Sequence, residues 1–162
     1  MNVEKIERKI SVIFATDVVD YSLHMEKDET GTVTSLRTYE KILKEAFKKH
    51  GGRLFNTGGD SFMAEFSSAV KAVECAIDFQ NIVKEKNIKP ALSFRIGINA
   101  GDVILQKKNL LGDGVNVAAR LEQLSQPDGI TISKSIFDYI EGKLDLKIQD
   151  LGIQKVKKNR FH

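Results

Sequence analysis

The chain has 162 residues, 41% of them hydrophobic and 29% charged, with a formal net charge of +3. A chain of this length can bury an ordinary core, so we expect one domain over residues 1–162. The single cysteine, Cys75, lies among apolar residues at helical spacing, which excludes a disulfide scaffold and favours a reduced, cytoplasmic protein. The apolar run from Ile10 to Ala15 is too short for a membrane span or the core of a signal peptide.

The first half of the chain predicts a strand, a helix and a pair of short strands. Ile10 to Val19 is rich in β-branched residues, which is typical of a buried strand. Apolar residues from Leu36 to Phe47 recur at helical spacing, with charged residues on the other face. Arg53 to Asn56 and Ser61 to Phe66 then predict a hairpin with Asp60 at or near its tip.

The second half predicts a further helix and more strands. Ser68 can cap a helix from Ala69 to Lys86. Leu92 to Ile98 and Asp102 to Leu105 predict two strands separated by a turn at Asn99 to Gly101. A helix, a strand, a short helix and a closing segment complete the pattern, at Val115 to Leu124, Ile130 to Ser133, Ile136 to Ile140 and Leu144 to Leu151.

This order of elements is β-α-β-β-α-β with additional strands and a short helix. It predicts an α+β fold of the ferredoxin-like type, in which two helices pack on one face of a mainly antiparallel sheet.

Two aspartates, Asp17 and Asp60, each lie beside a predicted strand, and glycines precede the second. Paired carboxylates at a sheet edge can hold divalent cations, so we predict one shared metal site. The alternative for each residue is structural, because Asp17 can cap the next helix and Asp60 can serve an ordinary turn.

Two further features suit phosphate chemistry. Asn116 and Arg120 are four residues apart and share one face of the predicted helix, where an amide and a guanidinium can stabilise a phosphoryl transition state. Arg95 lies between Phe94 and Ile96 in a predicted strand and would serve as a phosphate clamp. The alternatives are a surface arginine on the helix and an edge-strand arginine that faces water.

These residues fall within four ordered motifs that extend over nearly the whole chain. The motifs are FATDVVDYS from Phe14, NTGGDSFMAEF from Asn56, FRIGINAGDVI from Phe94 and GDGVNVAARLEQLSQPDGITIS from Gly112. Together they resemble the class III nucleotidyl cyclases, in particular bacterial adenylate/guanylate cyclase domains.

The resemblance implies a head-to-tail homodimer with two shared active sites, no nucleic-acid partner and no membrane segment in this domain. Asp17 and Asp60 match the ligands of two Mg²⁺ or Mn²⁺ ions, with the carbonyl of Val18 as an extra ligand. The turn through Tyr21 and Ser22 matches the triphosphate loop, and Arg95 matches a phosphate contact. From the other chain, Asn116 matches the residue that orients the ribose and Arg120 the one that stabilises the transition state. The implied reaction converts a nucleoside triphosphate, with ATP expected, to a 3′,5′-cyclic nucleotide and pyrophosphate.

The sequence departs from the family pattern at three places. Asn56 and Asn109 replace the lysine and aspartate that commonly select adenine, and this neutral pair could read adenine, guanine or a pyrimidine. Asp20 replaces a usual glycine near the phosphates, which could tighten metal binding or lower activity. The chain ends at His162, where related domains continue into a closing strand, so we expect a trimmed chain. Within this last segment the resemblance implies that Lys157 is a phosphate ligand.

Three alternative functions remain open at this point. The stretch GGDSF resembles the signature of diguanylate cyclases, but Ser61 replaces the glutamate that those enzymes need. A cyclase-like domain that has become a dimerisation or nucleotide-sensing module would explain Asp20 and the neutral base-reading pair. An RNA-binding sheet is the third, although the predicted central strands lack closely spaced exposed aromatic residues.

Overall fold

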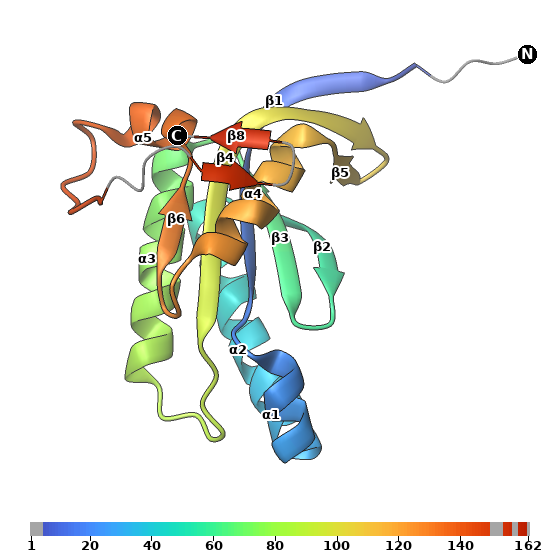
Figure 1. Cartoon of the computed structure of the whole chain (residues 1–162), viewed down its shortest axis with the longest axis vertical. Helices are drawn as coiled ribbons and strands as arrows, with labels where there is room; N and C mark the ends of the chain where they lie inside the picture. Colours follow the sequence, from blue (N-terminus) through green and yellow to red (C-terminus); the bar gives the residue numbers. More distant parts are fainter. Residues whose placement is uncertain (1–4, 150–153, 157–158, 162) are drawn as a thin grey trace, which may run out of the picture.

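The computed structural model describes residues 5–149, 154–156 and 159–161 (Figure 1). Its main sheet has six strands in the order β2-β3-β1-β4-β5, with β6 parallel to β4 and every other pair antiparallel. The strands of this sheet are β1 (Glu7–Val18), β2 (Arg53–Gly58), β3 (Ser61–Phe66), β4 (Phe94–Gln106), β5 (Asn109–Leu111) and β6 (Ile130–Ile132). The helices are α1 (Tyr21–Lys27), α2 (Glu29–His50), α3 (Ala69–Glu85), α4 (Asp113–Leu124) and α5 (Lys134–Ile140). A separate two-stranded antiparallel sheet pairs β7 (Gln154–Val156) with β8 (Asn159–Phe161).

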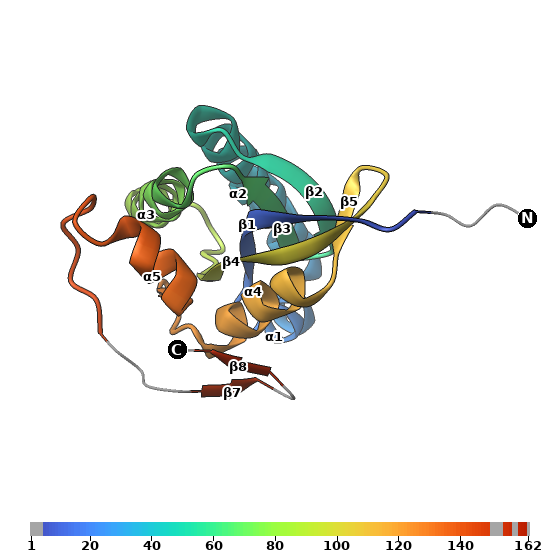
Figure 2. The same ribbon diagram turned by 90° about the horizontal axis from the view of Figure 1, so that it is seen from above.

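Helices pack on both faces of the sheet, so β1 is buried on both of its sides. Val12 and Phe14 belong to the larger core under α2 and α3, whereas Ile13 and Ala15 belong to a smaller core under α4. Figure 2 shows α2 and α3 on one side of the sheet and α4 on the other. The α+β prediction, with two helices on one face of a mainly antiparallel sheet, is confirmed.

Most predicted elements are present, but α2 begins earlier than the apolar spacing predicted. The side chain of Asp28 accepts a hydrogen bond from the backbone N–H of Gly31 at 3.0 Å and caps the helix before Glu29. The helix therefore includes Thr30 and Thr34, although threonine is a poor helix former. The short helix α1 was not predicted, and none of its residues is buried.

The predicted turn at Asn99 to Gly101 is wrong, because β4 runs through it without interruption from Phe94 to Gln106. Ala100 and Gly101 pair with Val12 and Ser11 of β1, so a long partner strand keeps these small residues in the ladder. Asn99 is buried, and its amide donates to the carbonyl of Gly114 at 3.0 Å, so it anchors α4 and does not turn the chain.

Two other predictions concern Cys75 and the closing segment. Cys75 is fully buried on α3, as the spacing predicted, and burial raises the pKa of its thiol to about 12. No helix or strand forms in residues 144–149, and residues 150 and 151 lie outside the described part. Within the described ranges, no helix has both the length and the apolar character needed to cross a membrane.

Candidate active site

Asp17 and Arg95 form the centre of the site, side by side on adjacent strands. They are direct partners in the antiparallel ladder between β1 and β4. The guanidinium of Arg95 donates to both oxygens of Asp17, from Nε to Oδ1 at 3.1 Å and from NH2 to Oδ2 at 2.9 Å. This paired hydrogen bond raises the pKa of Arg95 above its already high value, so Arg95 is a permanent cation.

Asp60 reaches the same place from the turn between β2 and β3. Its Oδ2 accepts a hydrogen bond from the backbone N–H of Val18 at 3.3 Å. Burial raises the pKa of Asp60, and the charge of Asp17 adds to this effect, while the hydrogen bond from Val18 lowers the pKa. The structure therefore brings the two predicted acidic residues together at the end of β1.

Glu122 of α4 is a member of this site that sequence reasoning missed. It is only 4% exposed, and its Oε2 lies 3.9 Å from NH2 of Arg95 and 2.5 Å from Nε2 of Gln123. Burial, followed by the charge of Asp17, raises the pKa of Glu122 above its ordinary value of 4.5. The available signal was a glutamate directly after Leu121 in an apolar stretch of helix, where a solvated side chain is unexpected.

Helix α4 comes close to β4 at Gly97, two residues after Arg95, and this close packing places Glu122 near the arginine. A Cβ at Gly97 would lie 2.2 Å from the backbone nitrogen of Glu122 and 2.5 Å from the carbonyl oxygen of Ala118. Helix α4 therefore rests directly on the strand, and this contact fixes the turn of α4 that carries Glu122.

Asp20 lies close enough for its charge to contribute to the raised pKa of Arg95, although it is not among the carboxylates within 4 Å of the guanidinium. Its backbone is left-handed, with φ 55° and ψ 40°, at the position where α1 begins. Tyr21 and Ser22 form the first turn of α1, and Tyr21 packs against the larger core. Among the described residues, no three His, Cys, Asp or Glu side chains are grouped closely enough to hold a metal ion, so Asp20 does not complete a three-ligand set with the pair.

Asn116 and Arg120 lie on another face of α4 from Glu122. Successive residues of a helix are rotated by about 100°, so Arg120 lies about 200° around the axis from Glu122. Asn116 is exposed and Arg120 half-buried, and no described hydrogen bond or ion pair joins either to Asp17, Asp60 or Arg95. The structure thus does not join this predicted pair to the acidic pair of the same chain.

Asn56 and Asn109 come from β2 and β5, which a hydrogen bond holds near each other. NH1 of Arg53 donates to the carbonyl of Lys108 at 2.8 Å, across the gap between the two strands. Oδ1 of Asn109 accepts from the backbone N–H of Leu110 at 2.9 Å, so its amide N–H groups are left for other contacts. Asn56 is exposed. Lys157, the last predicted phosphate ligand, lies outside the described residues.

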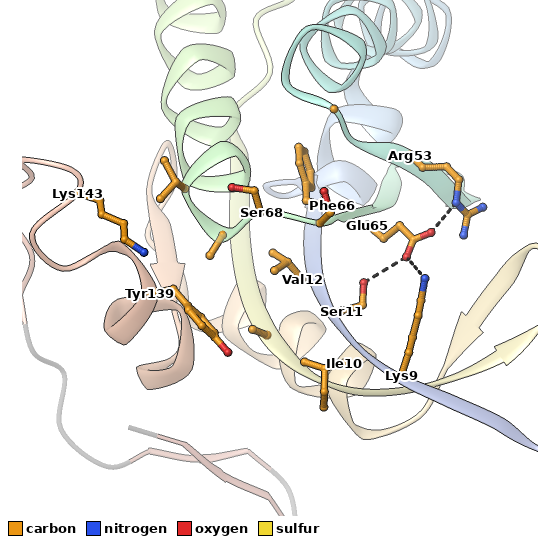
Figure 3. Close-up of a pocket in the computed structure, with 15 residues that line it drawn as sticks. Lys9, Ile10, Ser11, Val12, Arg53, Glu65, Phe66, Ser68, Tyr139 and Lys143 are labelled. Carbon is orange, nitrogen blue, oxygen red and sulfur yellow. Dashed lines mark hydrogen bonds and ion pairs between the residues drawn. The ribbon is translucent and has the colours of Figure 1, made fainter.

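A pocket of about 670 Å³ opens elsewhere, beside the N-terminal half of β1 (Figure 3). It is lined by both polar and apolar groups, including Ser11, Glu65, Ser68 and Tyr139. Neither Asp17 nor Asp60 contributes to its wall, so this hollow is separate from the acidic pair.

Comparisons with known proteins agree on one family. A family model described as the adenylate and guanylate cyclase catalytic domain matches residues 2–161. The chain is 41% identical over 159 residues to putative adenylate cyclase 3 of Rhizobium meliloti (strain 1021), a match that covers 95% of this chain and 27% of that protein. The chain therefore spans about a quarter of the length of that relative.

Two solved structures support the fold. An adenylate/guanylate cyclase/hydrolase from Silicibacter pomeroyi superimposes with a TM-score of 0.88 and 34% identity, over 97% of this chain and 95% of that one. A dimeric guanylyl cyclase domain from Blastocladiella emersonii, described as non-canonical, superimposes with a TM-score of 0.82 and 23% identity, over 96% of each chain. The second, at this identity, is evidence for the fold alone.

Proposed function

Because the chain belongs to the family of adenylate and guanylate cyclase catalytic domains, we propose that it is a nucleotidyl cyclase. In the proposed reaction the ribose 3′ oxygen of a nucleoside triphosphate loses its proton and bonds to the α-phosphorus. The bond from that phosphorus to the bridging oxygen breaks, so a 3′,5′-cyclic nucleotide and pyrophosphate are formed. ATP is the expected substrate, and identity to a relative named as a putative adenylate cyclase supports this choice.

The observation that carries the proposal is the convergence of Asp17 and Asp60 beside the single guanidinium of Arg95. Asp20 adds the charge of a third aspartate near the same guanidinium, so the aspartates outnumber it and the site favours divalent cations. Carboxylate oxygens, with the carbonyl of Val18, fit Mg²⁺ or Mn²⁺. Two such ions, when bound, would promote loss of the 3′ proton and offset the charge of the phosphates.

The chain's own residues would hold the triphosphate between α1 and β4. Arg95 is placed to contact the phosphates once Asp17 turns to a cation, because a guanidinium and a phosphate form paired hydrogen bonds. The first turn of α1, with Tyr21 and Ser22, would bind the outer phosphates through its backbone N–H groups. Lys157 remains a candidate phosphate ligand on the sequence resemblance alone.

A second copy of the chain would complete the site. Asn116 and Arg120 lie on a different face of α4 from the residue that meets Arg95, so we propose that they serve the acidic pair of a partner in a head-to-tail homodimer. Asn116 would orient the ribose, and Arg120 would stabilise charge that develops on the phosphate. Asn56 and Asn109 would contact the base, and the amide N–H groups of Asn109 can donate to it while its oxygen accepts from Leu110.

An alternative function is a dimerisation or nucleotide-sensing module with weak or no catalysis. Asp20 favours this alternative, because it adds a negative charge and a side chain at a left-handed position close to Arg95. That charge would repel the triphosphate.

The test is incubation of the purified protein with ATP, GTP, CTP and UTP in turn, with Mn²⁺, and identification of the products by mass spectrometry. A cyclic monophosphate from one nucleotide is expected and identifies the base. Cyclic di-GMP would indicate the diguanylate alternative, and nucleotide binding without any product would indicate the sensing module.

The shared site has its own test in two inactive variants. Asp60→Ala should lose activity because cation binding fails, and Arg120→Ala should lose turnover more than nucleotide binding. A mixture of the two should regain activity, since each heterodimer contains one site with both residues intact. If both variants are folded and dimeric but the mixture stays inactive, the shared site is wrong.

A further inference from the structure

We propose that Glu122 is a positioning residue, which keeps the guanidinium of Arg95 in the site when Asp17 binds a cation. The inference rests on the proposed function for the cation and for the role of Arg95 with phosphates. It goes beyond that function because it assigns a role to a residue that contacts neither substrate nor cation in the proposed mechanism.

One nitrogen of Arg95 lies between two carboxylates. NH2 of Arg95 is 2.9 Å from Oδ2 of Asp17 and 3.9 Å from Oε2 of Glu122. Within the described residues, these are the two carboxylates within 4 Å of this guanidinium. A small rotation of the arginine side chain would therefore shorten one contact while it lengthens the other.

Both carboxylate oxygens of Asp17 already accept hydrogen bonds. Both of its oxygens accept from Arg95, and Nε2 of Gln123 lies 3.4 Å from Oδ2. A divalent cation at Asp17 would compete for these oxygens and would repel the guanidinium. Arg95 must then find another acceptor inside the site or move out to water.

Glu122 is buried and held against β4, so it acts as a fixed acceptor. Its side chain is 6% exposed, and its backbone lies against Gly97, where even a methyl group would not fit. Arg95 has a long side chain that is 23% exposed, so it is the partner that moves. When it moves toward Glu122, it stays beside the end of β1, where a phosphate bound to the same cations would lie.

The experiment measures Mn²⁺ binding without nucleotide, by the electron paramagnetic resonance signal of free Mn²⁺. It compares the wild type with Glu122→Gln, Arg95→Gln and the double variant, and Glu74→Gln makes the same substitution at an exposed position of α3 as a control. Glu122→Gln should weaken Mn²⁺ binding by roughly tenfold, as loss of an outer partner of a metal ligand does. Without Glu122 as a second acceptor, Arg95 stays hydrogen-bonded to Asp17 and competes with Mn²⁺ for its oxygens.

The double variant separates positioning from simple charge. In the Arg95→Gln background the effect of Glu122→Gln should fall below about twofold, because no guanidinium remains to be placed. An equal loss in both backgrounds would mean that Glu122 acts by its charge or by folding alone, and would overturn the inference. So would unchanged Mn²⁺ binding in Glu122→Gln, or no Mn²⁺ binding by the wild type.

The result is independent of turnover. The titration contains no nucleotide, so a protein without cyclase activity can still confirm the role of Glu122. Conversely, an active cyclase whose Glu122→Gln variant binds Mn²⁺ like the wild type would refute the inference and leave the proposed function intact.

Discussion

Gly97→Ala should destabilise the protein strongly for a change of one methyl group. The new Cβ would lie 2.2 Å from the nitrogen of Glu122, 2.5 Å from the oxygen of Ala118 and 2.8 Å from the Cα of Glu122. All three atoms belong to the backbone of α4, so no side-chain rotation relieves the overlap, and the helix must move away from β4 by about 1 Å to reach an ordinary contact.

The expected cost is at the upper end of that for overpacked cores, about 3 kcal/mol. For a chain of this size, each kcal/mol lowers the midpoint of thermal unfolding by about 2 to 4 °C, so a decrease of roughly 6 to 12 °C is expected. Differential scanning calorimetry measures it. Gly58→Ala is the control, since a Cβ there meets Ser61 Oγ at an ordinary 3.6 Å. If Gly97→Ala unfolds at the temperature of this control, the direct contact between α4 and β4 is refuted.

Two other predictions concern charge. Burial acts to raise the pKa of Glu65, but hydrogen bonds from Arg53 and Lys9 outweigh it and hold the pKa below 4.5 (Figure 3). The ion pairs thus stabilise the fold fully above about pH 5 and less as the pH falls through the folded-state pKa. Glu65→Gln should lower the unfolding free energy at pH 7 by about 1 kcal/mol, because both partners are partly exposed. Urea titrations should show that this difference shrinks as the pH falls through the folded-state pKa of Glu65, and a difference independent of pH would contradict the ion pairs. Asp20→Gly should remove the strain of a left-handed backbone and increase cyclase activity several-fold. The control, Asp128→Gly, at a similar φ of 65°, should change stability alone. Equal effects of the two variants on turnover would show that Asp20 is not part of the site.

The local pattern of residues along the chain was sufficient to predict most helices and strands of the fold. Apolar periodicity predicted α2 and α3 because each helix buries one face, and the hairpin of β2 and β3 and the start of α4 followed from the glycines beside them. It failed at Asn99 to Gly101, because small and polar residues are typical of turns and nothing local reveals a long partner strand. It also missed α1, whose residues are not buried and therefore leave no periodic signal.

The sequence by itself determined the family and most of the order of elements, and it predicted Asp17 and Asp60 as the acidic pair, because these depend on residue type and spacing along the chain. The tertiary structure decided which charges meet. Arg95 takes Asp17 as its partner through the register of β1 and β4, and Glu122 joins them because α4 packs on the bare backbone of Gly97. Such contacts depend on distances between elements far apart in the chain, and spacing along a sequence does not contain them.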